Sequence, residues 1–334
     1  MANAQDKRLR QLQTLIEMTA LINSTLDTRE IRRRAIEAAT RLLDAEAGSL
    51  LLIDQKTGDL FFEVAIGTKS AKLKEIRLKM GQGISGWVAE HGEPVIIHDV
   101  TSDPRFFKGA DKKTKFASKN MVCVPVRTRK KIVGVLEAVN KKSGKFKPDD
   151  MEVLSALANQ VAVAIENARL YEEAITDSLT GLYHHKYFEL RLREELEKAK
   201  RYKHPVSLLM LDIDHFKKVN DKYGHLLGDR VLEGLALALR KSIRLGDIIS
   251  RYGGEEFTII LPHTNKKNAQ NAGERLRVTI EKMKFDGIRI TISIGIGYFD
   301  GKKMDFDYKE LISYADRSLY YAKQHGRNRV EFVM

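Results

Sequence analysis

Apolar and polar positions along this chain alternate between helical and strand patterns over its whole length. Helices are predicted from about 5 to 22 and from about 28 to 44, followed by strands at GSLLLID and LFFEVAIG. A glycine-rich turn then leads into a short helix within GQGISGWVAEHGEPVIIHDV, and NMVCVPVRTRKKIVGVLEAVNK predicts two further strands. This mixture of elements predicts an α/β (α+β) fold.

The clearest strand in the second half is VSLLMLDI at 206–213, a near-continuous apolar run that is typical of a strand buried on both faces. Asp212 and Asp214 stand at the end of this run. Hard cations such as Mg²⁺ take oxygen ligands and often share them with substrate phosphates. The sequence contains no GxxxxGK[ST] stretch, so a P-loop is excluded.

A second carboxylate pair follows two glycines in RYGGEEF at 251–257, between the strand patterns DIISRY and FTIILP. A Gly-Gly pair between two such runs predicts a two-residue hairpin, in which glycine supplies positive φ. Solvated glutamates on a surface hairpin are the alternative. Together with the upstream cluster, however, Asp212 and Glu255 can hold Mg²⁺ against a nucleotide.

Five motifs follow one another in the second half: DSLTGLYHHKYF, DIDHFKKVNDKYGHLLGD, RYGGEEF, TISIGIG and ADRSLYYAKQHGRNRV. In this order they resemble the GGDEF family of diguanylate cyclases. The resemblance implies an enzyme in which two GTP molecules, one on each of two facing domains, condense to cyclic di-GMP and two pyrophosphates. It therefore implies a homodimer with GTP as substrate.

The resemblance also implies roles for individual positions. Asp212, Glu255 and the carbonyl of Ile213 match metal ligands, with Mg²⁺ as the expected ion and Mn²⁺ as an alternative; Glu256 matches an adjacent acid that is a ligand or assists the base. The matching substrate-binding positions are Gly253 and Gly254 under the α-phosphate, Lys217, Lys323 and Arg327 at the phosphates, and Asn220 and Asp229 at the guanine edge. Phe216 is a further substrate-binding candidate. For Lys323 and Arg327, a charged last turn of a helix is the alternative.

Two further features lie near these motifs. Arg244 and Asp247 in RLGD have the spacing of the family's inhibitory product site, where cyclic di-GMP binds, and Arg275 is a candidate third member. The alternatives are an exposed ion pair for RLGD and a solvated helix position for Arg275. His184 and His185 depart from the family's usual motif, and we assign them only helix capping or local contacts.

The first half resembles a GAF domain, an α/β sensor module with an antiparallel sheet. GISGWVAEHGEPVIIHDV and VPVRTRKKIVGVLEAVNK carry this resemblance. It implies an unknown small-molecule ligand. NKKSGKFKPDD partly resembles the corresponding stretch of cyclic-nucleotide-binding members, but its final acids differ, and a structural turn into the next helix is favoured.

Between the halves, residues 149–180 contain neither Pro nor Gly. Apolar positions spaced by three and four predict a coiled-coil helix, with a seam at Met151, Leu154, Ala158, Val161, Ile165, Ala168, Glu172 and Ile175. A helix packed on its own domain shows the same stripe, and we favour the dimer seam. The expected organisation is an N-terminal helix at 1–24, a GAF domain at 25–150, the linker at 151–176 and a GGDEF domain at 177–334.

The chain has 334 residues, a length that is typical of two domains of ordinary size. No apolar run is long enough to span a membrane and the first residues are charged, so a cytoplasmic location without membrane contact is expected. The single cysteine, Cys123, lies in an apolar strand and is expected to be a buried hydrophobe.

The net charge of +13 raises the alternative of nucleic-acid binding. Much of it lies in basic stretches at 69–79, 108–115, 127–131 and 140–147. No recognised DNA-binding motif is evident, so solvated loops and edge-strand lysines are favoured. A second alternative to the cyclase is a catalytically silent receptor that binds GTP or cyclic di-GMP and signals through a protein partner.

Overall fold

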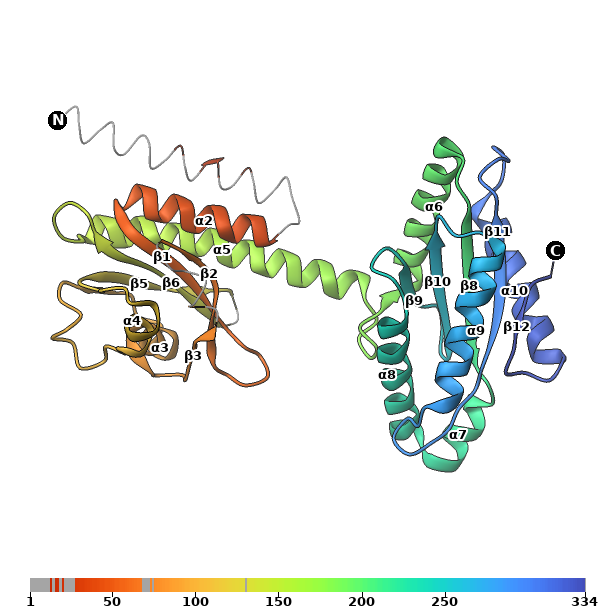
Figure 1. Cartoon of the computed structure of the whole chain (residues 1–334). Coiled ribbons are helices and arrows are strands. Elements are labelled where there is room, and N and C mark those ends of the chain that lie inside the picture. The colour runs from red at the N-terminus through yellow and green to blue at the C-terminus, as the bar shows by residue number, and fades with distance from the viewer. Residues whose placement is uncertain are drawn as a thin grey trace. The chain divides into compact units, whose positions relative to one another are not determined.

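The computed structural model describes residues 28–67, 75–129 and 131–333, together with the single positions 13, 16, 17, 20 and 73. The helix expected within 1–24 therefore lies outside the continuously described ranges. The chain divides into two compact units, Met1–Leu170 and Tyr171–Met334. Each unit contains a β-sheet with helices packed against its faces, so the predicted fold class is confirmed (Figure 1).

The first unit is built on a six-stranded sheet of described residues in the order β3-β2-β1-β6-β5-β4, with every neighbouring pair antiparallel. Its elements are α2 (Thr28–Leu42), β1 (Ala45–Ile53), β2 (Leu60–Ile66), β3 (Arg77–Leu78), α3 (Gly83–His91), β4 (Val95–Ile97), α4 (Gly109–Thr114), β5 (Met121–Arg127), β6 (Ile132–Lys141) and α5 (Pro148–Ile175). Helices α2 and α5 cover one face, and α3 and α4 lie on the other (Figure 1). The buried Cys123 on β5 confirms the expectation for that residue.

Helix α5 begins inside this first core. Leu154, Ala158 and Val161 of the expected seam are fully buried, in one cluster with α2 and the sheet. For these three residues the dimer-seam prediction is wrong and the alternative holds, because the apolar stripe packs on its own domain. The later part of the helix is less buried: no residue of 165–175 is buried, and Leu170 is 50% exposed.

The turn before α5 is also explained by local structure. Asp150 accepts the backbone N–H of Lys147 at 2.9 Å and pairs with Lys141 Nζ at 2.8 Å. Asn140, at a φ of 57°, accepts the N–H of Lys119 through its side chain. The NKKSGKFKPDD stretch thus starts a helix, which is the structural interpretation favoured from its sequence.

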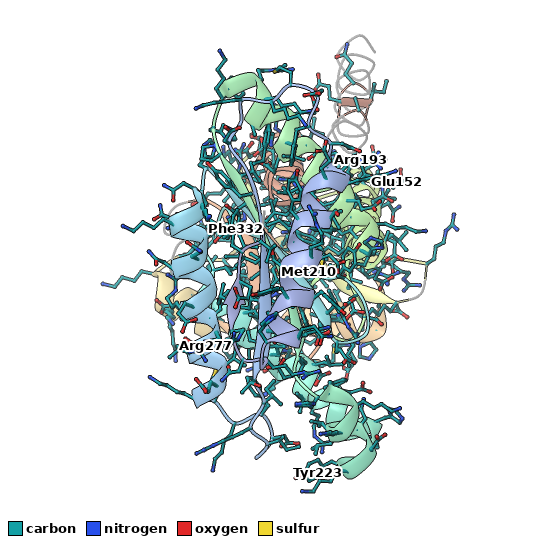
Figure 2. All side chains as sticks on the ribbon, turned by 90° about the vertical axis from the view of Figure 1, so that its right-hand side faces the viewer. Glu152, Arg193, Met210, Tyr223, Arg277 and Phe332 are labelled. Atoms are coloured by element: carbon teal, nitrogen blue, oxygen red, sulfur yellow. The ribbon has the colours of Figure 1, made fainter. Side chains whose placement is uncertain are left out.

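The second unit contains a six-stranded sheet of described residues in the order β12-β11-β8-β10-β9-β7. The four central strands pair antiparallel, and the edge pairs β7 with β9 and β11 with β12 are parallel. Its elements are β7 (Tyr183–His184), α6 (His185–Tyr202), β8 (Val206–Ile213), α7 (Phe216–Tyr223), α8 (His225–Ser242), β9 (Ile248–Arg251), β10 (Glu256–Pro262), α9 (Lys266–Lys282), β11 (Ile292–Phe299), α10 (Tyr308–Gln324) and β12 (Val330–Glu331). Figure 2 marks Met210 on the central strand and Tyr223 at the exposed end of α7.

Strand β8 is buried over its whole length, as its apolar run predicts. Leu209, Leu211 and Ile213 face α8 and α9, whereas Leu208 and Met210 face α6 and α10. Since side chains alternate along a strand, Asp212 belongs to the face that α10 covers. This register decides which helix can place a basic side chain beside the Asp212 carboxylate.

Candidate functional site

Asp212 lies at the end of the most buried strand and is 7% exposed. In the sheet register it stands opposite Glu256 of β10 on one side and Ser293 of β11 on the other. Lys323, near the end of α10, places its Nζ 2.7 Å from Asp212 Oδ2. The structure therefore brings together a carboxylate, the glutamate hairpin and a lysine that are far apart in sequence.

Three carboxyl groups share this place and oppose one another's ionisation. Burial raises the pKa of Asp212, and the Lys323 ammonium acts in the opposite direction. Burial, and then the charge of Asp212, raise the pKa values of Glu255 and Glu256. Raised pKa values at neighbouring acids mark a site that gains from added positive charge.

The donor set fits a hard divalent cation, because carboxylate and carbonyl oxygens are the ligands that Mg²⁺ prefers. In the described ranges, no group of three or more His, Cys, Asp or Glu side chains is arranged to hold a metal ion by itself. A cation here would draw on Asp212, Glu255 and the carbonyl of Ile213, with substrate oxygens completing its shell, as Mg²⁺ sites commonly do.

Strands β9 and β10 form the hairpin that RYGGEEF predicts, but the turn differs from the expected one. Strand β9 ends at Arg251 and β10 begins at Glu256, so four residues separate the strands instead of two, and Tyr252 donates its N–H to Glu256 O at 2.8 Å. Gly253 and Gly254 are not among the residues with positive φ, so that prediction is wrong. A longer loop needs no left-handed residue, and the glycines instead supply space: a side chain at Gly254 would meet nothing within 4 Å.

Arg251 and Asp177 hold this hairpin, and the sequence reading gave neither residue a role. The Arg251 guanidinium donates to Gly254 O at 2.8 and 3.1 Å and to the Asp177 carboxylate at 3.1 and 3.2 Å. Asp177 also accepts the N–H and the hydroxyl of Thr180. The aspartate of the DSLTGL motif thus anchors the glutamate hairpin. Both motifs belong to the same predicted domain, and this is the only signal in the sequence that could have suggested a contact between them.

Helices α7 and α8 carry the candidate base-reading residues. Asn220 Oδ1 is buried without a hydrogen-bond partner among the described residues, and it would lie 1.9 Å from a Cβ added at Gly228. Phe216 is buried beneath it, while Lys217 and Asp229 are exposed. A buried acceptor without a partner is unfavourable unless a ligand donates to it, and the N–H groups of guanine are suitable donors.

The alternative that Lys323 merely complements a helix end does not account for its ion pair. Lys323 is in the last turn of α10, yet its ammonium pairs with Asp212 of β8. Arg327 is exposed and follows the helix at a φ of 60°. Its positive charge lowers the pKa of Asp212, as does that of Lys323, so both cations act on the same carboxylate.

The RLGD residues form a separate pocket of about 230 Å³. Arg244 and Asp247, which were proposed from their spacing, line it together with Arg275, the candidate third member. The Asp247 carboxylate accepts the backbone N–H of Arg244 at 2.9 Å, which leaves the Arg244 guanidinium to line the pocket. A pocket with two guanidinium groups and one carboxylate suits a ligand that carries both phosphate and N–H donors.

His184 has the capping role expected for it. It is the N-cap of α6, where Nδ1 accepts the Tyr187 N–H at 3.2 Å, and its Nε2 hydrogen-bonds the Ala174 carbonyl at the end of α5. His185 packs edge-on against Tyr252 with ring centroids 4.4 Å apart. Both histidines make the local contacts expected near the entrance of the second unit.

Among the described residues of the first unit, small cavities of about 70 Å³ each are lined by Phe62, Glu137 and Val139. Glu137 is buried, accepting from Ser49 Oγ at 2.6 Å and from Ser85 Oγ at 2.5 Å. Burial raises the pKa of this carboxyl group. A polar anchor in an aromatic-lined cavity is a suitable place for a small ligand.

The comparisons with known proteins divide the chain at the same place as the fold. Residues 174–329 match the family described as diguanylate cyclase, GGDEF domain, and residues 25–166 match the GAF domain family. Among the described residues, no helix has the length and apolar composition needed to cross a membrane.

Among the relatives, Diguanylate cyclase A of Treponema denticola is 37% identical over 219 residues, covering 62% of this chain and 58% of the relative. Response regulator PleD of Caulobacter vibrioides is 40% identical over 166 residues, covering 48% of this chain and 36% of the relative. The chain thus spans less than two thirds of the length of these curated relatives.

A solved structure of the coiled coil and GGDEF domain of DgcB from Caulobacter crescentus, in complex with c-di-GMP, is also similar. It is 28% identical with a TM-score of 0.50, and the match covers 55% of this chain and 99% of that one. The agreement concerns the second unit, while the match over 25–166 concerns the first. The chain is therefore similar to the GAF domain family over its first unit and to the GGDEF domain family over its second.

Proposed function

We propose that the chain is a diguanylate cyclase that condenses two molecules of GTP into cyclic di-GMP and releases two pyrophosphates. The observation that carries the proposal is the meeting of Asp212, Lys323 and the glutamate hairpin at one end of the second sheet. Matching relatives that are named for this activity support it.

Mg²⁺ bound by Asp212, Glu255 and the Ile213 carbonyl would lower the pKa of the attacking 3′-hydroxyl and neutralise charge on the leaving pyrophosphate. Lys323 and Arg327 add fixed positive charge at the phosphates. Glu256 lies beside Asp212 in the register, where it can serve as a further ligand or assist removal of the hydroxyl proton.

The remaining substrate residues bind and orient the nucleotide. The open space at Gly254 lets an α-phosphate approach the hairpin backbone. Asn220 offers guanine its unpartnered carbonyl, and the Asp229 carboxylate can accept from guanine N1–H and N2–H. Lys217, exposed on α7, is positioned to attract the phosphates as a point charge.

Two forms of control belong to the proposal. Cyclic di-GMP binds at Arg244, Asp247 and Arg275 and inhibits, which the shared pocket supports. A small ligand in the Glu137 cavity of the GAF domain regulates activity through α5. The reaction needs two facing domains, so we propose a homodimer whose contact uses the exposed later part of α5, around Leu170.

Incubation of the purified chain with GTP and Mg²⁺, with the product identified by chromatography and mass spectrometry, tests the activity. Cyclic di-GMP and pyrophosphate should form with the wild type and not with Glu255→Gln. Binding of cyclic di-GMP without any turnover would favour the silent receptor instead, a reading that the Arg244 pocket by itself also allows.

A further inference from the structure

The turn that follows α10 has an unusual backbone. Gly326, Arg327 and Asn328 are consecutive residues with positive φ, at 114°, 60° and 48°. For a residue other than glycine, the left-handed conformation is sterically unfavourable, although asparagine adopts it more readily than most residues. Arg327 has no such preference, so contacts from elsewhere in the domain are needed to hold this turn.

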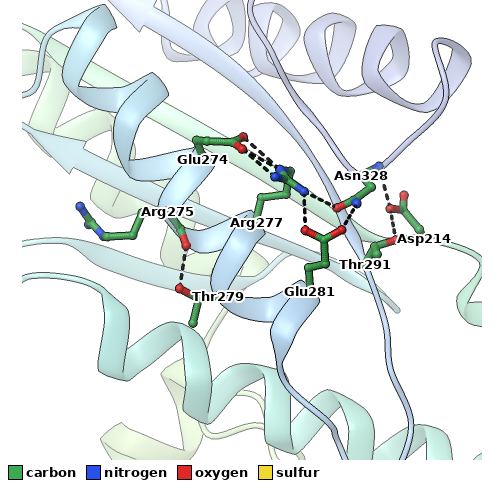
Figure 3. Close-up of polar contacts among 8 residues, drawn as sticks. All are labelled: Asp214, Glu274, Arg275, Arg277, Thr279, Glu281, Thr291 and Asn328. Carbon is green, nitrogen blue, oxygen red and sulfur yellow. Dashed lines mark hydrogen bonds and ion pairs between the residues drawn. The ribbon is translucent and has the colours of Figure 1, made fainter.

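Asn328 receives those contacts from three directions (Figure 3). Its backbone N–H donates to Asp214 Oδ2 at 3.0 Å, and its side-chain Nδ2 donates to Glu281 Oε1 at 2.7 Å. Its Oδ1 accepts from Arg277 Nη1 at 2.9 Å. We call Asp214, Arg277, Glu281 and Asn328 the Asn328 clamp.

The far side of the clamp is anchored on α9. Arg277 is 15% exposed, donates to both oxygens of Glu274 and pairs with Glu281 at 2.9 Å. Charge-assisted contacts on two sides, with a planar fork, leave the guanidinium little freedom to turn. Arg277 is thus a rigid support that itself belongs to none of the proposed substrate-binding positions.

The near side of the clamp is anchored at the end of β8. The buried Asp214 accepts the hydroxyls of Thr291 and Ser293, each at 2.6 Å, in addition to the Asn328 N–H. The Asp214 carboxylate is thus occupied by protein donors and supports the turn, whereas Asp212, two residues earlier, is the proposed metal ligand. The same strand end carries the proposed metal ligand and the support of the turn.

We infer that the Asn328 clamp positions Arg327 for the phosphates of GTP, so that Arg277 and Asn328 are positioning residues of the nucleotide site. The inference rests on the proposed function. Arg327 is the neighbour of Asn328 in the chain, and its charge acts on Asp212. If the clamp is lost, the turn is free to leave its left-handed conformation, and the guanidinium leaves the phosphates.

The test measures binding of a non-hydrolysable GTP analogue with Mg²⁺ to the full chain by calorimetry. Arg277→Ala should weaken binding about tenfold, the loss expected for one displaced charge-assisted contact. Arg191→Ala is the matched control, because Arg191 also pairs with two glutamates three and four residues along its own helix, at 3.0 and 3.4 Å, without touching the turn. It should bind as the wild type does.

A double-mutant comparison separates positioning from general stability. In an Arg327→Ala background, adding Arg277→Ala should weaken binding no further, since the positioned group is already absent. Asn328→Gly tolerates the left-handed backbone but lacks the clamping amide, and it should bind as weakly as Arg277→Ala.

Each other result overturns the inference. Wild-type affinity in Arg277→Ala, or equal losses from Arg277→Ala with and without Arg327, means that the clamp only joins α9 to the C-terminal strand. Wild-type affinity in Asn328→Gly reduces the clamp to a backbone requirement. A wild-type chain that neither binds the analogue nor forms cyclic di-GMP removes the proposed function, and the inference with it.

Discussion

Two aspartates at the end of β8 should respond in opposite ways to the same substitution. Asp212 and Asp214 are equally exposed, at 7% each. Asp214 accepts three hydrogen bonds from protein donors, whereas Asp212 pairs with the partly exposed Lys323 and faces two glutamates. Asp→Asn keeps the shape and removes the charge, so it tests what each charge contributes.

The contacts give the sign and the size of each effect. Burial of a carboxylate costs several kcal/mol, and a partly exposed ion pair returns about 1 kcal/mol or less. Asp212→Asn should therefore raise the free energy of unfolding by about 1–2 kcal/mol while abolishing cyclase activity. Asp214→Asn should lower it by about 1–3 kcal/mol, because an amide cannot accept all three bonds.

Calorimetric unfolding of the full chain in EDTA, without nucleotide, measures both changes. For a domain of this size, 1 kcal/mol moves the midpoint by about 2–4 °C. The pKa of Asp212 is raised in the folded chain, so its ionisation destabilises the fold at neutral pH. The advantage of Asp212→Asn should shrink as the pH falls towards 3.8, the ordinary value for aspartate. Lower stability of Asp212→Asn at pH 7, or retained activity, would refute this reasoning.

Three further predictions concern control and specificity. Arg244→Ala and Asp247→Ala should each relieve inhibition by added cyclic di-GMP about tenfold or more while catalysis continues, since both line a pocket that does not include Asp212 or the glutamate hairpin; unchanged inhibition curves would return RLGD to an ordinary surface turn. GTP should be used in strong preference to ATP, because adenine leaves the Asp229 carboxylate without its N–H donors; efficient formation of cyclic GMP-AMP from a mixture of the two would contradict the base assignment. Four residues inserted after Ala168, beyond the buried part of α5, should change activity strongly by shifting the helical phase, whereas seven should change it little; equal activities would leave the helix as a tether.

Much of the fold could be predicted because its signals are local. The continuous apolar run of β8 and the paired runs around RYGGEEF are consequences of burial on a sheet, and the structure contains both strands. The candidate carboxylates could be predicted in the same way, since they stand at the ends of recognisable strands. The turn between β9 and β10 was missed because a Gly-Gly pair is compatible with several loop lengths, and the length depends on which residues pair in the ladder.

Contacts between distant segments could not be read from local patterns. Arg251 binds Asp177 across 74 positions, and Asn328 binds Asp214 across 114. In the sequence, each of these residues resembles an ordinary charged or turn position. Its partner depends on how the strands and helices pack.

Apolar periodicity and motif spacing are properties of the chain, so they are enough to predict the main strands, the order of the two domains and the carboxylates that can meet a cation. The partner of each surface, in contrast, depends on how the elements pack. The stripe on α5 specifies an apolar face without specifying what covers it, and over Leu154, Ala158 and Val161 its own domain does so. Likewise, the alternation of β8 determines that Asp212 and Leu211 face opposite ways, but packing of α10 on one of those faces is what brings Lys323 to the carboxylate.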